Sequence, residues 1–224
     1  MGYTIHFGQV APYFGYLLGG AGISLVLAGL AFSGGLLIGA FGAAGLTWGG
    51  PILRRIVRCY VVFFTNTPAL VQVYFLYFVL PEWGVLLNSF DAVLIGLTVN
   101  AGAYLTEVER AGFASVHQAE LDAAETMGMS LVQTVWYVIV PHAVLTLYPP
   151  LTGQFILIIL GSSMGAVFGV EELTGRAFSV NAETFRSIEI FTIAGLLYVL
   201  VTFIASLLLA AAGRTLFRAK VGLI

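Results

Sequence analysis

Long apolar runs make up most of the chain, and short polar stretches separate them. The first run extends from about Phe14 to Leu46. As a helix, roughly 33 residues reach about 50 Å, more than the bilayer's hydrocarbon thickness of about 30 Å. The excess is explained either by an interfacial lead-in or by a bend near Ser33-Gly34-Gly35. Glycines spaced four apart predict close helix packing: Gly15 with Gly19, and Gly35 with Gly39.

Two more apolar runs follow before the chain becomes polar. One covers Val57–Leu80 and stops at Pro81-Glu82-Trp83, and the next extends from about Asp91 to Arg110. Each is long enough to cross about 30 Å of hydrocarbon as a helix. We therefore expect three spans in the first half of the chain.

The second half contains two spans and a shorter apolar segment. Only ten residues, Leu131–Val140, precede Pro141. This is too short to span a bilayer, so we expect them to lie at the interface or to pack under the bundle. A fourth span then runs from Pro141 to about Leu160, and Gly161–Thr184 forms an external connection. The last span covers Ile188–Ala212.

Basic residues gather at one end of the predicted spans. Cytoplasmic loops are enriched in Lys and Arg, and five spans place seven of the nine basic residues on that side: Arg54, Arg55, Arg58, Arg110, Arg214, Arg218 and Lys220. Arg176 and Arg186 then lie outside, and an even number of spans would put one terminal cluster on the wrong face. The predicted fold class is an all-α integral membrane protein with about five transmembrane helices, the N-terminus outside and the C-terminus inside.

Composition agrees with a membrane protein and excludes several kinds of site. The chain is 59% hydrophobic and 9% charged, with a mean hydropathy of +0.99, whereas a soluble domain carries roughly 25% charged residues. A net charge of −2 gives no indication of a nucleic-acid partner. The single cysteine excludes an internal disulfide, and the three histidines show no metal-ligand spacing, so we expect no metal site. No basic residue precedes Arg54, so the first run is expected to remain in the mature protein.

The segment LDAAETMGMS (Leu121–Ser130) lies within a polar region, residues 112–130, that is cytoplasmic in this topology. Leu121–Met127 predicts a short helix, with Asp122 and Glu125 in solvent and Leu121, Ala124 and Gly128 on one face. Such small side chains allow another protein to approach closely. An ordinary amphipathic loop explains the same pattern.

The end of this short helix has its own signals. Gly128 is suited to end it in the left-handed conformation, which glycine adopts at little cost. Ser130 and Gln133 match a capping box that starts the next helix. The pattern therefore predicts a helix, a glycine turn and a second helix.

Four segments of the chain occur in the order found in one transporter family. DAAETMGMS followed by IVPHA resembles an EAA loop, with Asp122-Ala123-Ala124, Gly128 and Val140-Pro141 at the motif positions. Three other segments resemble F-R-G-T-P-x-L-V-Q, G-A-Y-x-x-E-x-x-R-G-G and the lead into the last span: FFTNTPALVQVYFLYFVLP (Phe63–Pro81), GAYLTEVERAG (Gly102–Gly112) and ETFRSIEIF (Glu183–Phe191). Over about residues 20–215, the chain resembles ATP-binding-cassette importer permeases of the polar amino acid uptake subfamily, such as histidine and glutamine permease subunits. Their five-span topology with an external N-terminus also matches.

The chain departs from the family pattern at a few positions. Asn66 replaces a glycine, Thr65 replaces an arginine, and Ala111 replaces the first glycine of R-G-G. Leu160 stands where the family often has a lysine. These changes put the substrate in doubt but not the coupling mechanism.

The resemblance implies the membrane-spanning subunit of an ATP-driven importer. Residues 1–19 would be an extracytoplasmic lead-in, 20–215 the permease domain with its coupling loop at 112–140, and 216–224 a cytoplasmic tail. Alternating access would import a polar amino acid, or a related amine or opine. The chain has no G-x-x-x-x-G-K-[ST] phosphate loop. ATP and Mg²⁺ would therefore be used by a partner ATPase, and the chain itself would be no enzyme and would bind no cofactor.

The implied assembly lies in the bacterial cytoplasmic (inner) membrane. It contains two ATPase subunits, a second permease chain that is identical or homologous, and an extracytoplasmic solute-binding protein that presses on the outer loops near Pro81–Phe90 and Gly161–Thr184. A cytoplasmic coupling helix between spans three and four would contact the ATPase through six residues: Glu120, Asp122, Ala123, Ala124, Glu125 and Gly128.

Polar groups within the spans are the candidates for the substrate path, because each needs a partner or water in lipid. They are Asn66, Thr67, Gln72, Asn100, Gln154, Ser162 and Ser163. Structural explanations compete with this role. Asn66 and Thr67 precede Pro68 and are placed to repair the helix break there, and the other amides are able to bond between helices. An ion pair with Arg110 is a simpler explanation for Glu107 than a role in the path. The aromatic run Tyr74–Phe78 is expected to pack against other helices or face lipid rather than to form a ligand cage.

Two other classes of protein fit the sequence less well. A secondary transporter or channel subunit needs embedded charges that bind a coupling ion, and we place no acid in the middle of a span. An intramembrane enzyme needs a convergent catalytic set, and the sequence shows no Ser/His/Asp or metal cluster.

Overall fold

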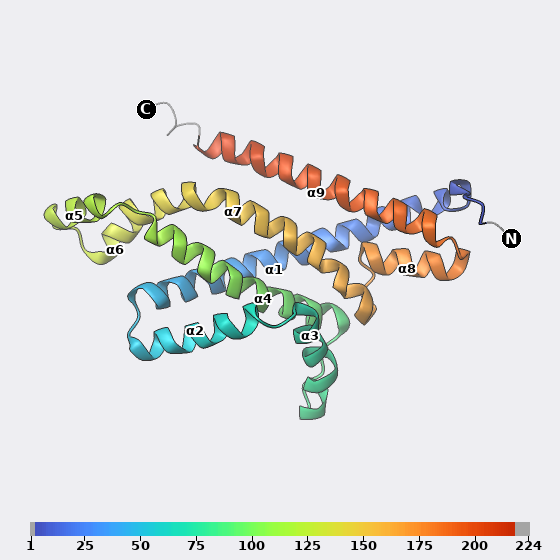
Figure 1. The fold of residues 1–224 in the computed structure, drawn as a ribbon, viewed down its shortest axis with the longest axis horizontal. Helices are drawn as coiled ribbons and strands as arrows, with labels where there is room; N and C mark the ends of the chain where they lie inside the picture. The colour runs from blue at the N-terminus through green and yellow to red at the C-terminus, as the bar shows by residue number, and fades with distance from the viewer. Residues whose placement is uncertain (1–2, 218–224) are drawn as a thin grey trace. The chain divides into compact units, whose positions relative to one another are not determined.

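The computed structural model describes residues 3–217, which form helices without any strand (Figure 1). They divide into two compact units that alternate along the chain. The first contains residues 3–32, 69–98 and 155–208, and the second contains 33–68, 99–154 and 209–217. Four long helices contribute residues to both units: α1 (Phe14–Trp48), α4 (Ser89–Ala114), α7 (Val140–Gly161) and α9 (Ser187–Phe217).

The first unit has its core where α1 and α9 meet α8 (Leu173–Thr184). Buried side chains on each helix repeat every three or four residues and therefore form one apolar face: Leu17 and Ala21 on α1, Leu173, Ala177 and Val180 on α8, and Ile190, Ala194 and Leu197 on α9. The shorter elements of this unit are η1 (Phe7–Gln9), η2 (Ala11–Tyr13), α3 (Ala69–Tyr74), η3 (Phe75–Val79), η4 (Leu80–Trp83) and η6 (Ser162–Phe168).

The aromatic run of α3 and η3 packs within this unit. Phe168 is buried, and its ring centroid lies 5.0 Å from that of Tyr74 and 5.5 Å from that of Tyr77. Tyr74 also stacks on Phe78 at 5.5 Å. These contacts agree with the packing interpretation of the run.

The second unit contains α2 (Pro51–Thr65), α5 (Gln118–Thr126), α6 (Leu131–Thr134) and η5 (Val135–Ile139). Here α1 and α4 approach closely through glycine. A Cβ added at Gly35 would lie 3.0 Å from the Ala101 Cβ, and one at Gly39 would lie 2.9 Å from the Leu105 Cβ. The packing predicted for this pair of glycines is confirmed. In the other pair, Gly19 faces Arg176, whereas Gly15 has no atom within 4 Å of such a Cβ.

The expectation that Leu131–Val140 forms a segment separate from the fourth span is wrong. Helical structure continues from Leu131 to Phe168 through α6, η5, α7 and η6, and Pro141 does not end it. In a regular α-helix the ring of Pro141 would clash with the carbonyl of Tyr137. Tyr137 lies within η5, a π-helical turn. The wider turn accommodates the proline and keeps the run helical.

The second predicted span is also not one continuous helix. It begins earlier than expected, at Pro51, and is interrupted at Asn66–Pro68, between α2 and α3. Pro68 lacks the amide hydrogen that a continuing helix needs, and it disfavours helical geometry at Thr67. By contrast, α1 remains helical through Ser33–Gly35.

Three helical runs of the described residues are long and apolar enough to cross a membrane: Ala11–Trp48, Leu131–Phe168 and Ser187–Gly213. The broken pair Pro51–Thr65 and Ala69–Trp83 would be a fourth. The third predicted span, α4, is not among these runs, because polar residues such as Asp91 and Asn100 lower its mean hydropathy. The expected external connection after α7 is largely helical, in η6 and α8. The basic residues Arg218 and Lys220 lie outside the described residues.

Candidate functional site

The short helix predicted in the polar loop is present as α5, and it begins at Gln118, three residues earlier than expected. Its sequence, QAELDAAET, contains three acids and no basic residue. Ala124 is 1% exposed and faces the rest of the unit. Glu120, Asp122, Ala123 and Glu125 are exposed. The outer face of α5 is therefore acidic and has a small residue near its centre.

The predicted turn and cap after α5 are confirmed. Gly128 has φ +72, the left-handed conformation. Its N–H donates to the Glu125 carbonyl at 2.9 Å, and the Met129 N–H donates to the Ala124 carbonyl at 3.0 Å, which together form a Schellman motif. Ser130 and Gln133 form a reciprocal capping box that starts α6. These bonds fix the C-terminal end of α5 to the following helix.

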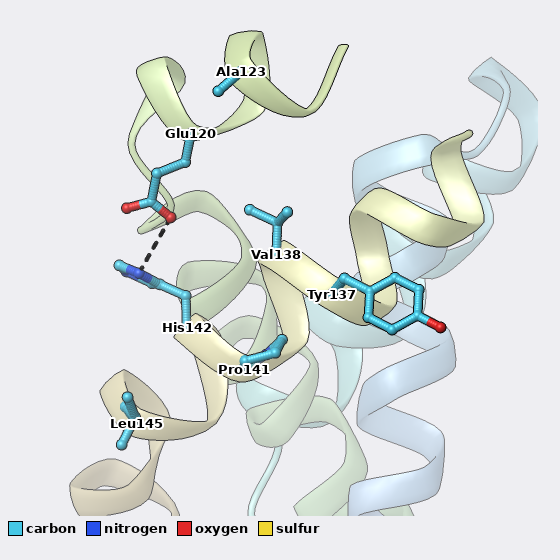
Figure 2. A pocket seen from close by; sticks show the side chains of 7 residues that line it. All are labelled: Glu120, Ala123, Tyr137, Val138, Pro141, His142 and Leu145. Carbon is cyan, nitrogen blue, oxygen red and sulfur yellow. Dashed lines mark ion pairs between the residues drawn. The ribbon is translucent and has the colours of Figure 1, made fainter. Parts of the chain in front are cut away.

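A groove of about 420 Å³ separates α5 from η5 and α7 (Figure 2). Its lining combines apolar and titratable side chains: Glu120, Ala123, Tyr137, Val138, Pro141, His142 and Leu145. The lining residues of α5 face those of the helical run that begins with α6.

One ion pair crosses the groove at the N-terminal end of α5. The Nδ1 atom of His142 lies 3.8 Å from Oε2 of Glu120 (Figure 2). The His142 side chain is 29% exposed and that of Glu120 is 44% exposed. The His117 ring lies nearly perpendicular to the His142 ring, with 6.4 Å between centroids. Both residues lie in or beside the EAA-like segments, DAAETMGMS and IVPHA, but the sequence analysis did not pair them.

The end of α2 is a second polar cluster, and it includes three of the predicted path residues. Asn66 donates to the Val62 carbonyl at 2.8 Å, Thr67 to the Phe63 carbonyl at 2.9 Å, and Asn100 of α4 to the Phe64 carbonyl at 3.1 Å. Helix C-termini leave carbonyls without intrahelical donors. These side chains supply donors at the break, as the structural explanation of Asn66 and Thr67 anticipated.

The remaining path candidates fall in different units. Gln72 is buried in the first unit. Ser162 is also buried there and donates to the Ile159 carbonyl at 2.7 Å, and the neighbouring Ser163 donates to the Leu160 carbonyl at 2.7 Å. Gln154 is half-buried in the second unit. The predicted pair of Glu107 and Arg110 is confirmed at 2.6 Å.

Buried acids are the feature that the sequence interpretation missed. Glu172 is 0% exposed and accepts hydrogen bonds from four groups: the N–H groups of Thr174 (3.0 Å) and Gly175 (2.8 Å), the Ser24 hydroxyl (3.1 Å) and the Tyr198 hydroxyl (2.7 Å). It therefore caps α8 and links that helix to α1 and α9.

Two other acids are also buried. Glu189 of α9 accepts from Tyr3 and from the N–H of His6, and the bond to this carboxylate raises the pKa of Tyr3 above its ordinary value. Glu109 of α4 is 7% exposed, and its Oε1 has no hydrogen-bond partner among the described residues. All three acids lie at or near helix ends, whereas the expectation concerned acids in the middle of a span. Ser24 and Tyr198, which donate to Glu172, and Tyr3 and His6, which donate to Glu189, come from segments far away in sequence, where no local pattern reveals them.

Comparison with known proteins identifies the family. The glutamine transport system permease protein GlnP of Escherichia coli (strain K12) is 33% identical to the chain over 200 residues, covering 88% of the chain and 91% of the relative. The family described as "Binding-protein-dependent transport system inner membrane component" matches residues 35–218. The chain belongs to this family. The permease is thus a membrane transport subunit rather than an enzyme, and the family predicted from the four segments is confirmed.

Other relatives extend the comparison. The octopine transport system permease protein OccM of Rhizobium radiobacter is 30% identical to the permease over 204 residues, covering 85% of the permease and 81% of the relative. A solved structure described as the crystal structure of an amino acid ABC transporter with histidines matches with a TM-score of 0.89 at 29% identity. It covers 95% of the permease and 100% of that chain. The match therefore includes both units of the permease.

Proposed function

We propose that the permease imports a polar amino acid, or a related amine or opine, that an extracytoplasmic solute-binding protein delivers. Relatives that transport glutamine and octopine at 33% and 30% identity support this substrate class. Asn66, Thr67 and Asn100 gather at the end of α2, where a change in the helix break would release polar groups toward a substrate. Gln72, Gln154, Ser162 and Ser163 are the further path residues of this proposal.

The observation that carries the coupling mechanism is the geometry of α5. A capped helix presents exposed acids around Ala123, and its small side chain leaves room for close contact with another protein. A separate ATPase subunit docks on this face, and its closure on ATP moves α5 and the helices that follow. The assembly contains two ATPases and two permease chains, because each permease supplies one such helix.

Five spans place α5 in the cytoplasm. In this proposal α4 crosses the membrane despite its polar residues, and the broken pair of α2 and α3 counts as one span. The arginines at the start of α2 then lie inside, and so does α5. The N-terminus lies outside, in the bacterial inner membrane.

Topology is tested by thiol labelling. Cys59 is the single cysteine of the chain, so Cys59→Ala gives a cysteine-free background in which Glu125→Cys is the only target. A membrane-impermeant maleimide is expected to label inside-out vesicles and not right-side-out cells. Labelling of intact cells would refute both the cytoplasmic position of α5 and the ATPase contact.

Transport is tested in proteoliposomes that contain the permease, its ATPase and its binding protein. Uptake of labelled glutamine or octopine is expected to require ATP and to survive a protonophore. A secondary transporter would show the reverse. This measurement also decides between the amino acid and the opine.

Coupling is tested by Ala123→Arg, which places a long cation on the docking face. We expect the complex to lose uptake driven by ATP. Ile52→Arg is the matched control, because it adds the same charge to a side chain that is 76% exposed at the start of α2, on the same side of the membrane. Normal coupling in Ala123→Arg would contradict the proposed role of α5.

A further inference from the structure

The start of α2 carries a cluster of positive charge that the chain itself does not neutralise. Arg54, Arg55 and Arg58 are all exposed and lie close together in the sequence RRIVR. Arg58 is one helical turn from both Arg54 and Arg55, so the like charges repel on one side of the helix. Among the described residues, no carboxylate lies within ion-pair distance of any of the three. An anion from outside the chain would relieve this repulsion.

The three arginines differ in how they are held. The Arg54 guanidinium donates to the Thr47 carbonyl at 2.8 Å, close to the end of α1. No described group bonds to the guanidinium groups of Arg55 and Arg58. A guanidinium presents its N–H donors in a planar fork that matches two oxygens of a phosphate. Arg55 and Arg58 are therefore the pair that is available to hold a phosphate.

An exposed apolar stripe runs along α2 beside these charges. Ile52, Ile56, Cys59 and Phe63 follow one another at intervals of three or four residues, which places them on one face of the helix. Ile52 is 76% exposed, Ile56 is 61% exposed and Phe63 is 59% exposed, and Cys59 is exposed as well. Arg55 lies at the edge of this stripe, one turn from both Ile52 and Cys59. From Ile52 to Phe63 a helix rises about 17 Å, close to half of a hydrocarbon core of about 30 Å. The stripe therefore matches the depth of one lipid leaflet.

We propose that α2 binds an anionic phospholipid, whose phosphate lies between Arg55 and Arg58 and whose acyl chain packs along the stripe from Ile56 toward Phe63. An apolar stripe that begins beside unpaired guanidinium groups matches a molecule with an anionic head and an apolar tail. A free anion would leave the stripe uncovered, and an acidic protein surface would have no use for it. The proposal rests on the proposed topology, in which the start of α2 lies at the cytoplasmic face of the membrane.

This site differs from the general excess of basic residues in cytoplasmic loops. That excess requires only positive charge, which lysine supplies equally well. A phosphate held between Arg55 and Arg58 favours the planar donors of arginine, and the stripe adds a requirement for an apolar tail. The permease should therefore bind anionic phospholipid saturably, in a way that depends both on the two arginines and on Ile56.

The experiment titrates the detergent-purified transporter complex with phosphatidylglycerol or with phosphatidylcholine and counts bound lipids by native mass spectrometry. The wild-type complex should bind phosphatidylglycerol about tenfold more tightly than phosphatidylcholine, and Arg55→Gln/Arg58→Gln should weaken that binding about tenfold to thirtyfold. Arg55→Lys/Arg58→Lys should fall between the two. Ile56→Gln should weaken binding about fivefold, and it retains every charge that orients the chain, so it tests the site independently of membrane insertion. Arg110→Gln is the control, because that arginine is already paired with Glu107 at 2.6 Å, and it should bind lipid as the wild type does.

The proposal is overturned if phosphatidylcholine binds as tightly as phosphatidylglycerol, if Arg55→Gln/Arg58→Gln binds lipid normally, or if inorganic phosphate at the same concentration displaces the lipid. Loss of the ATPase from that variant with unchanged lipid binding would assign the arginines to the ATPase instead. Oxidative cross-linking of Cys59 between two permease chains would show that the stripe faces a second copy, and this too would overturn the proposal. Failure of the proposed function is a separate result, because lipid binding is measured without ATP or substrate, whereas that failure appears as normal coupling in Ala123→Arg.

Discussion

Glu172 offers a severe test of how the first unit is held together. We predict that Glu172→Ala strongly destabilises the permease, whereas the same change at the neighbouring Glu171 has little effect. Glu172 is 0% exposed and accepts four hydrogen bonds. Glu171 has a 66% exposed side chain and approaches Arg176 only at 3.9 Å. The two acids are adjacent in sequence, so they form a matched pair.

The expected loss follows from the donors that Glu172→Ala leaves behind. Removing the helix cap, whose acceptors serve Thr174 and Gly175, costs about 0.5–2 kcal/mol. The Ser24 hydroxyl becomes a buried donor without its acceptor, at about 1–3 kcal/mol. Tyr198 retains a contact with Thr174 Oγ1 at 2.9 Å and adds less. The two terms sum to about 1.5–5 kcal/mol, whereas loss of a surface pair at Glu171 changes stability by under about 0.5 kcal/mol.

Thermal stability of the detergent-purified permease is the appropriate assay. For a chain of this size, each kcal/mol shifts the midpoint by about 2–4 °C, so Glu172→Ala should lower it by roughly 3–20 °C. Size-exclusion chromatography after a fixed period of heating reports the folded fraction. A thiol-reactive dye would be unsuitable, because Cys59 is already exposed in the folded protein.

Glu172→Gln separates charge from shape. The glutamine amide oxygen can still accept from the Gly175 N–H. Its NH₂ group, however, replaces the oxygen that accepts from the Thr174 N–H and from the hydroxyls of Ser24 and Tyr198. An intermediate loss, about 1–3 kcal/mol, is expected. If Glu172→Ala melts within 1–2 °C of Glu171→Ala, the four hydrogen bonds do not stabilise the unit, and the reasoning is refuted.

Three further changes test the second unit by the same assay. Gly39→Ala should cost about 1–3 kcal/mol, because its Cβ would lie 2.9 Å from that of Leu105. Gly22→Ala on the same helix is the control: its Cβ would meet no atom within 4 Å, so this change should be neutral or slightly stabilising. Equal midpoints for the two variants would show that close packing of α1 on α4 is unimportant. Asn100→Leu should cost about 1–3 kcal/mol, because a donor to the end of α2 is lost; an unchanged midpoint would mean that this carbonyl needs no side-chain donor. Gly128→Ala should cost about 1 kcal/mol, because φ +72 is unfavourable for alanine, and a higher midpoint would contradict the Schellman geometry.

The elements predicted correctly are those whose signals are local in the sequence. Gly128 and the pair Ser130/Gln133 mark a turn and a cap within a few residues, and the structure contains both. Glu107 and Arg110 are one turn apart on a helix, so their ion pair follows from spacing alone. The close approach at Gly35 and Gly39 follows from the absence of a side chain at these positions. The glycine spacing does not predict which helix is the partner.

The contacts that sequence reasoning missed join distant segments. Ser24 and Tyr198 reach Glu172 only after α1, α8 and α9 have packed together. His142 meets Glu120 because η5 brings α7 to the groove beside α5. In each case both residue types are common, and their positions in one sequence give no reason to pair them. Fold-level packing decides which acids become buried and which donors they receive.

Proline misled the placement of helix boundaries at Pro68 and Pro141 for a related physical reason, whereas the predicted stop at Pro81-Glu82-Trp83 agrees with the end of η4 at Trp83. A ring at position i excludes the amide bond to residue i−4 and collides with its carbonyl, which favours a break. Before Pro81 and before Pro141, the i−4 residues are Tyr77 and Tyr137, and each lies within a π-helical turn, η3 or η5. Such a turn displaces the obstructing carbonyl, so helical structure continues past the ring. Pro68 is preceded by an ordinary α-helix that ends at Thr65, and there the chain does break. Pro149 and Pro150 lie inside α7, where the i−4 residues Leu145 and Thr146 are α-helical. The preceding turn therefore explains how the helix passes Pro141, but it does not by itself decide where a helix ends.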